Sequence, residues 1–274
     1  MHCCYLVLCW LIACSADHLH GKGEAALDAH DLSAAEISFR AALDKKPAHL
    51  PSLVGLGWTY HLAGEKDAAS AAFDRCLQLE PGKGDCMRGR ASVALSAGDR
   101  TLARQLIDEA LLKHPDDPLV ESSAALIDLS DGNIYAAEER YRSLAMRFPE
   151  RAEYLLGLGE ALFRKGDEQE ALRLAEQALQ LKGTPLRYQA MLWALRARAI
   201  LRASSGLEDP DRCAETAPPV LAWIEAAEES VRTAEGTGVR MPELPVLRRL
   251  VLRRKAILFE ACPSAASPAA GPGG

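Results

Sequence analysis

The feature that most constrains this chain is a set of residue types that recur every 34 positions between residues 16 and 185. One column consists of prolines: Pro47, Pro81, Pro115 and Pro149. A second consists of glycines: Gly64, Gly98, Gly132 and Gly166. A third consists of alanines: Ala35, Ala69, Ala103, Ala137 and Ala171. Because the columns share one period, we expect the chain to fold as repeated copies of one small unit.

The stretch 50–83 shows the form of that unit. One face of its first helix is predicted by four residues at helical spacing: Leu53, Leu56, Gly57 and Tyr60. Gly64 then ends this helix, because glycine accepts the left-handed conformation that follows many helices. The inner face of the second helix is predicted by Ala69, Phe73 and Cys76. Pro81 ends the second helix, so the unit is a helical hairpin.

The pattern L-x2-L-G-x2-Y, A-x3-F and P resembles a tetratricopeptide repeat (TPR), with Leu53 in the position where Trp is usual. Two further columns pair a small residue with a bulky one inside each hairpin. The small residues are Gly23, Gly57, Ala91, Ala125 and Gly159. The bulky residues are Phe39, Phe73, Ile107 and Tyr141, with Ala175 as the weak member. The resemblance implies an all-α fold, a right-handed α-solenoid of helix hairpins with a C-terminal capping helix.

We divide the chain where the period changes. The predicted parts are a signal segment (1–14), five tandem repeats (15–185), a divergent sixth repeat with an inserted loop (186–235), a linker and capping helix (236–262), and a disordered tail (263–274). Pro218 and Pro219 are expected to open the second helix of the sixth repeat. The capping helix carries several Arg and Lys residues. They form either a basic surface for anionic lipid or an acidic partner, or an ordinary solvated face, and we take the solvated face.

The N-terminal residues 3–16 are apolar and too short to cross a bilayer, and they fit the apolar segment of a secretory signal. The run Leu11–Cys14 resembles the lipobox of bacterial lipoproteins. That resemblance implies a diacylglyceryl group on Cys14, and Ser15 after it implies the outer membrane, facing the periplasm. His2 precedes the run where Lys or Arg is usual. The alternative is the buried first helix of a cytoplasmic protein.

Four cysteines would remain after cleavage, and two of them flank one inter-repeat turn. Cys76 and Cys86 are equally far from Pro81, so they face each other across that turn. An oxidising compartment would permit a disulfide between them. The alternative is that Cys76 only fills a small packing position.

Several function classes find no support in the sequence. A net charge of −6 argues against a nucleic-acid partner. No phosphate-binding glycine loop, HExxH or GxSxG is present, so we predict a non-enzyme without cofactors. Asp17, His18 and His20 do not predict a metal site, because helical residues two apart point in nearly opposite directions. A polar pocket near the loop 207–217 would instead favour an enzyme or a ligand-binding protein.

Repeat folds bind partners along an extended surface, so we expect a protein-interaction scaffold. The free faces of the first helices predict the binding groove: Val54, Trp58, His61, Arg88, Leu126, Glu160 and Phe163. A groove of this composition favours a protein or peptide segment with apolar character. Trp58 is either an anchor for that segment or a cover for the neighbouring repeat. The whole resembles bacterial TPR lipoproteins of envelope assembly, such as pilotins; the alternative is a cytosolic TPR adaptor without a lipid anchor.

Overall fold

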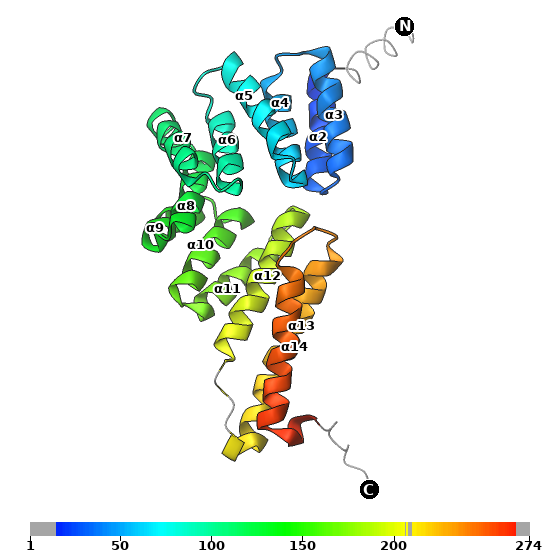
Figure 1. Cartoon of the computed structure of the whole chain (residues 1–274), viewed down its shortest axis with the longest axis vertical. Helices are drawn as coiled ribbons and strands as arrows, with labels where there is room; N and C mark the ends of the chain where they lie inside the picture. Colours follow the sequence, from blue (N-terminus) through cyan, green and yellow to red (C-terminus); the bar gives the residue numbers. More distant parts are fainter. Residues whose placement is uncertain (1–14, 206, 208–209, 267–274) are drawn as a thin grey trace. The chain divides into compact units, whose positions relative to one another are not determined.

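A computed structural model describes residues 15–205, 207 and 210–266. These residues form thirteen α-helices and two short 3-10 helices, and they contain no β-strand (Figure 1). The prediction of an all-α fold is confirmed. No helix in the described part of the chain is long and apolar enough to cross a membrane. Cys14 lies outside the described residues.

The chain divides into two compact units, with the boundary between Arg140 and Tyr141 inside α9 (Ile134–Arg147). The other helices of the first unit are α2 (Ala16–Asp28), α3 (Leu32–Lys45), α4 (Leu50–Ala63), α5 (Lys66–Leu79), α6 (Gly84–Ser96), α7 (Arg100–Lys113) and α8 (Pro118–Asp131). In this unit α2 and α3, α4 and α5, and α6 and α7 form hairpins. Each first helix also contacts the first helix of the next hairpin, which is how a solenoid stacks.

The second unit continues the same arrangement. Its other helices are α10 (Ala152–Lys165), α11 (Glu168–Leu179), α12 (Leu186–Ala203), α13 (Cys213–Gly236) and α14 (Leu244–Ala261), with 3-10 turns at Pro210–Arg212 and Pro263–Ala266. Helix α10 contacts α12, and α12 contacts α14. The alternate helices α10, α12 and α14 therefore lie next to one another.

The glycine column ends the first helix of each hairpin. Gly64, Gly98, Gly132 and Gly166 all have positive φ, from 83° to 99°. The equivalent position of the first hairpin is occupied by His30, which adopts φ 58°, the one positive φ among the described non-glycine residues. The 34-residue period therefore holds in the backbone even where the sequence departs from glycine.

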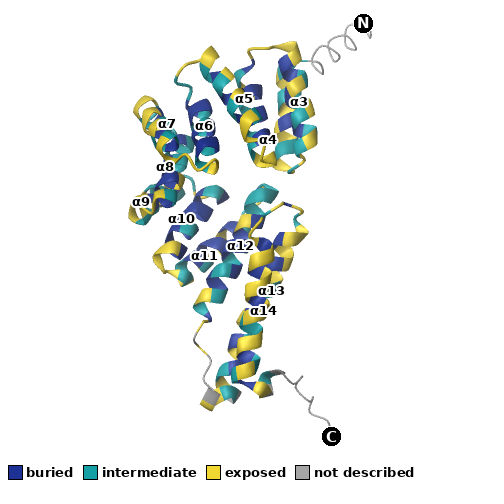
Figure 2. Ribbon diagram, viewed as in Figure 1, coloured by how far each residue is buried: buried dark blue, intermediate teal, exposed yellow. Residues whose placement is uncertain are grey.

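In the first two hairpins, a ring from the second helix is enclosed by two glycines of different hairpins. Phe73 of α5 is fully buried, and a Cβ atom on Gly57 of α4 or on Gly89 of α6 would lie within 3.0 Å of its ring. Phe39 stands in the same relation to Gly23 and Gly55. Each ring thus fills space that neighbouring hairpins share. Figure 2 colours the buried residues of these helices dark blue.

The start of α13 differs from the prediction. The helix begins at Cys213, so Pro218 and Pro219 lie inside it rather than opening it. Cys213 forms a disulfide with Cys262, which directly follows α14. This cross-link fixes the chain near 213 against the end of the capping helix, and the helix continues from there through both prolines. The inserted loop is correspondingly shorter than the expected range 207–217.

Candidate partner-binding site

Three predicted groove residues, from α4 and α6, meet in the first unit. The Trp58 ring packs edge-on to Phe73, with 5.6 Å between the ring centroids, and lies at the same distance from His61. The guanidinium carbon of Arg88 lies 4.9 Å from the centre of the Trp58 ring. Arg88 is held in place by an ion pair to Asp85, one turn earlier on α6, at 2.9 Å. We call Trp58, His61 and Arg88 the tryptophan cluster.

The polar atoms of the tryptophan cluster are only partly used. The indole Nε1 of Trp58 is buried and has no hydrogen-bond partner in the described part of the chain. His61 Nε2 lies 3.1 Å from the Ser92 hydroxyl. Burial lowers the pKa of His61, and the nearby positive charge of Lys66 lowers it further. The cluster therefore combines an imidazole that resists protonation and a buried, unused N–H with a guanidinium.

The other predicted groove residues of this unit differ in exposure. Val54 is half-buried and packs on the core around Phe73. Leu126 on α8 is 44% exposed. Trp58 also packs on this core while remaining partly exposed.

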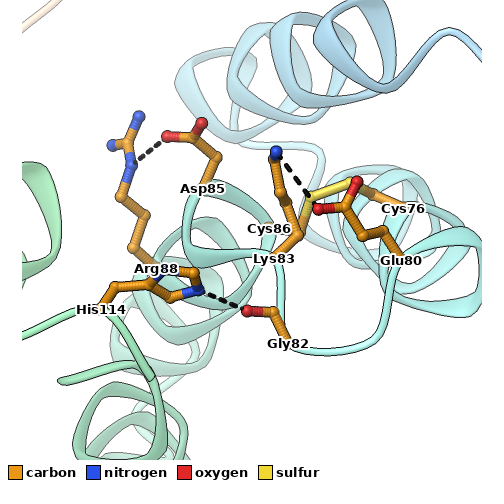
Figure 3. The surroundings of a disulfide bond; sticks show 8 residues. All are labelled: Cys76, Glu80, Gly82, Lys83, Asp85, Cys86, Arg88 and His114. Atoms are coloured by element: carbon orange, nitrogen blue, oxygen red, sulfur yellow. Dashed lines mark hydrogen bonds and ion pairs between the residues drawn. A yellow bond between two sulfur atoms is a disulfide. The ribbon is translucent and has the colours of Figure 1, made fainter. Parts of the chain in front are cut away.

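The turn between α5 and α6 carries the first disulfide. The structure joins Cys76 and Cys86 with 6.1 Å between their Cα atoms, and both residues are fully buried (Figure 3). His114 Nε2 donates a hydrogen bond of 2.7 Å to the carbonyl oxygen of Gly82 in the same turn. Since Cys86 immediately follows Asp85, the cross-link lies next to the carboxylate that holds Arg88 over Trp58.

The two predicted residues of the second unit, Glu160 and Phe163, lie on α10 and contact arginines of α12. The Phe163 ring lies 3.8 Å from the guanidinium carbon of Arg202 and 5.1 Å from that of Arg198. Arg202 also donates a 2.8 Å hydrogen bond to the carbonyl oxygen of Phe163. Glu160 forms an ion pair with Arg198. The sequence analysis missed both arginines, because they belong to the repeat whose pattern diverges.

The second disulfide, Cys213–Cys262, was not predicted either. Its Cα atoms are 5.3 Å apart, although 49 positions separate the residues in sequence. The only hint in the sequence was the number of cysteines. Four follow residue 15, so a pair between Cys76 and Cys86 leaves two others that can pair with each other.

Beside the inserted loop is a hollow of about 370 Å³ between the start of α13 and the loop. Its lining is Leu207, Arg212, Glu215, Thr216, Pro219, Val220 and Trp223. Among the described residues of its lining, Arg212 and Glu215 are the charged groups, and they pair with each other. The remaining lining is mainly apolar.

Three hydrogen-bonded side chains of the first unit, Asp17, His49 and Ser52, have the residue types of a nucleophilic triad. His49 lies 2.7 Å from the Ser52 hydroxyl through Nδ1 and 3.0 Å from the Asp17 carboxylate through Nε2. Ser52 is fully buried, so its hydroxyl does not face a substrate. The arrangement instead links α2 to the start of α4. In the described ranges no group of His, Cys, Asp or Glu is placed to hold a metal ion.

The family model described as "Tetratricopeptide repeat" matches residues 20–85 and 123–185. These two stretches consist of tetratricopeptide repeats. A TPR protein from Parabacteroides merdae has the same fold, with a TM-score of 0.62 and 18% identity over 86% of this chain and 84% of that chain. PilW, described as a widely conserved type IV pilus biogenesis factor, has a TM-score of 0.52 and 15% identity over 85% of this chain and 97% of its own.

Among curated proteins, this TPR chain is 31% identical over 222 residues to the cellulose synthase operon protein C of Xanthomonas axonopodis pv. citri. The match covers 75% of this chain and 14% of that relative. A match to cellulose synthase 1 operon protein C of Komagataeibacter xylinus has 29% identity and covers 54% of this chain and 12% of the relative. The chain thus spans about one seventh, or less, of the length of these curated relatives.

Proposed function

We propose that this TPR protein is a non-catalytic scaffold of the bacterial envelope that binds an apolar segment of a partner protein through the faces of its first helices. The tryptophan cluster carries the proposal. A tryptophan that is partly exposed, covered by a guanidinium, and left with an unused N–H has the features of a binding hot spot, since aromatic residues and arginine dominate such sites.

Two observations support an envelope location. Cys76–Cys86 and Cys213–Cys262 are both placed as disulfides, which persist in oxidising compartments. The names of the similar proteins also refer to cellulose synthesis and to pilus biogenesis. We extend the proposal to a lipid anchor on Cys14 and to the outer membrane, with the protein facing the periplasm. The cytosolic adaptor is the competing proposal, and it requires free thiols at these four cysteines.

A photo-crosslinking experiment tests the partner site. A photo-reactive residue at position 58 should capture a protein partner in cells. One at Gln78, exposed on α5, should not. Trp58→Ala should weaken binding of the captured partner by about 2 kcal/mol or more. Trp58→Phe keeps an aromatic ring against Phe73 and removes the N–H, so it separates binding from packing. If Trp58→Ala melts far earlier while its folded fraction binds normally, Trp58 belongs to the core and the site is wrong.

A second experiment tests location. Cys14→Ser should abolish lipid labelling and release the protein from membranes. Mass spectrometry that finds an intact Met1 on a protein with free thiols would favour the cytosolic adaptor.

A further inference from the structure

The second unit contains a cleft of about 470 Å³ that is apolar and cationic at once. We call it the arginine cleft, and its lining is Phe163, Arg198, Leu201, Arg202, Leu247, Leu250, Arg253, Arg254 and Ile257. The residues come from the end of α10, from α12 and from α14, so the cleft is formed by the first helices of successive hairpins. Its volume is in the range of ligand-binding pockets.

The charge of the arginine cleft is unbalanced. Four arginines line it, and no carboxylate among the described residues does. At its edge, Glu160 pairs with Arg198 and Glu168 lies 3.4 Å from Arg202. Arg253 is exposed and forms no ion pair with any residue that the structure describes. Positive charge therefore remains for an occupant to neutralise.

Burial leaves the charge of Arg254 poorly solvated. Arg254 donates a hydrogen bond to the carbonyl oxygen of Ser204, and desolvation lowers its pKa. A partly desolvated guanidinium gains from a carboxylate, because charge-assisted hydrogen bonds strengthen where water is excluded.

Apolar and basic residues alternate along the exposed surface of α14 that borders the cleft. Leu250 and Ile257 are 46% and 42% exposed, and they lie seven positions apart on one face of the helix. Arg253 and Arg254 stand between them. An exposed apolar–cationic–apolar stripe at helical spacing matches a second helix with the order apolar, acidic, apolar on one face.

The geometry points to an amphipathic helical segment of a partner protein, with Asp or Glu between two apolar residues of its buried face, as the occupant of the arginine cleft. This inference rests on the proposed scaffold function and adds the partner's chemistry to it. The apolar residues of the segment pack against Leu250 and Ile257. Its carboxylate lies between Arg253 and Arg254.

The test begins with a library of helical peptides of about 14 residues, roughly 21 Å long, randomised along one face and selected on the purified full chain. Enriched peptides should carry Asp or Glu between apolar residues, and fluorescence anisotropy gives their affinities. Arg253→Glu should weaken binding about tenfold. Arg248→Glu changes the same charge on the same helix at an exposed residue outside the cleft, and it should change affinity less than twofold.

A charge exchange makes the test specific. Replacing the acidic residue of the selected peptide by Lys should abolish binding to the natural protein and restore it to Arg253→Glu. Leu250→Ser should weaken every selected peptide, because it removes an apolar contact without touching a charge. Selection of the same peptides on the natural protein and on Arg253→Glu, or no rescue by the exchange, overturns the inference.

Other occupants give different results. If Arg253→Glu abolishes binding to phosphatidylglycerol vesicles and no peptide is selected, the cleft is a membrane surface and the inference is wrong. If the variant instead dissociates a dimer in sedimentation, the occupant is a second copy. If a partner captured at position 58 binds Arg253→Glu unchanged and selected peptides do not compete with it, the inference fails and the scaffold function stands. If position 58 captures no partner and no peptide is selected, both the inference and the scaffold function fail.

Discussion

Gly89 of α6 lies directly against the ring of Phe73 of α5, with no room for a side chain between them. We expect Gly89→Ala to destabilise the protein by about 1–3 kcal/mol through overpacking, although alanine favours helices. Gly21→Ala is the matched control. Gly21 also lies within a helix but meets nothing within 4 Å, so its substitution should stabilise by about 0.5–1 kcal/mol. Urea unfolding measures both.

A compensating substitution sharpens this prediction. One period later, Ser123 occupies the position of Gly89 and the fully buried Ile107 that of Phe73, so a larger residue than glycine goes with a smaller one than a ring. Phe73→Ile should therefore recover part of the stability that Gly89→Ala loses. Equal losses in Gly89→Ala and in the double variant would contradict the proposed fit between ring and glycine.

The turn glycines should resist substitution for a different reason. Gly98 has φ 88° and nothing within 4 Å of a built Cβ, so only backbone strain opposes a side chain. We expect Gly98→Ala to cost about 1–2 kcal/mol in thermal or urea unfolding. His30 occupies the equivalent turn at φ 58°, and His30→Gly relieves the same strain there. A neutral Gly98→Ala would show that the turn adopts another conformation at low cost.

The two disulfides should differ in their contribution to stability. The chain-entropy account gives about 3 kcal/mol for the short Cys76–Cys86 loop and about 4 kcal/mol for the longer Cys213–Cys262 loop. The double variants Cys76→Ser/Cys86→Ser and Cys213→Ser/Cys262→Ser separate the two effects. Alkylation of all four thiols in unfolded, non-reduced protein from its native compartment would refute both cross-links.

Protonation of His61 should destabilise the first unit in mild acid. Its pKa in the folded state is below the ordinary value of 6.5, chiefly because of burial. The unfolded state therefore binds the proton first, and stability present above pH 6.5 is lost as the pH falls through the folded pKa. The slope from this group is at most about 1.4 kcal/mol per pH unit. His61→Gln should reduce the loss between pH 7.5 and 5.5, whereas His18→Gln at an exposed position should not.

Core truncation should damage the stack locally. Leu56 is buried in the second hairpin, and Leu56→Ala should cost about 2–5 kcal/mol. Because each hairpin contacts mainly its neighbours, hydrogen exchange should accelerate most in α2 to α7. A uniform loss of protection up to α14 would contradict local coupling.

The repeat period was sufficient to predict the hairpins, because turn glycines, terminal prolines and buried faces must recur together in a stacked fold. It also contained a column that the prediction did not use: Gly55, Gly89 and Gly157 share the period, and each lies against an aromatic ring. A pattern within one hairpin identifies the ring's partner in that hairpin. The partner in the next hairpin appears only when neighbouring repeats are stacked.

The candidate sites were less predictable than the hairpins. Trp58 and Arg88 could be placed on free faces from their spacing, but the Asp85 carboxylate that orients Arg88 could not be inferred from the period. Arg198 and Arg202 lie in the divergent repeat. The recurring residue types do not continue there, so they do not indicate which face of the helix each arginine occupies. The start of α13 depends on a cross-link between distant positions, which local helix signals do not contain.

The shared rings also restrict how such a chain changes length during evolution. Phe39 belongs as much to the hairpin that follows it as to its own. A duplication or deletion whose length is not a multiple of the full period would shift the register of the repeats. It would then bring a ring against a side chain instead of a glycine. Recombination can therefore lengthen or shorten the protein only in whole steps of the period, and a change of ring size must be accompanied by changes in two adjacent copies of the motif.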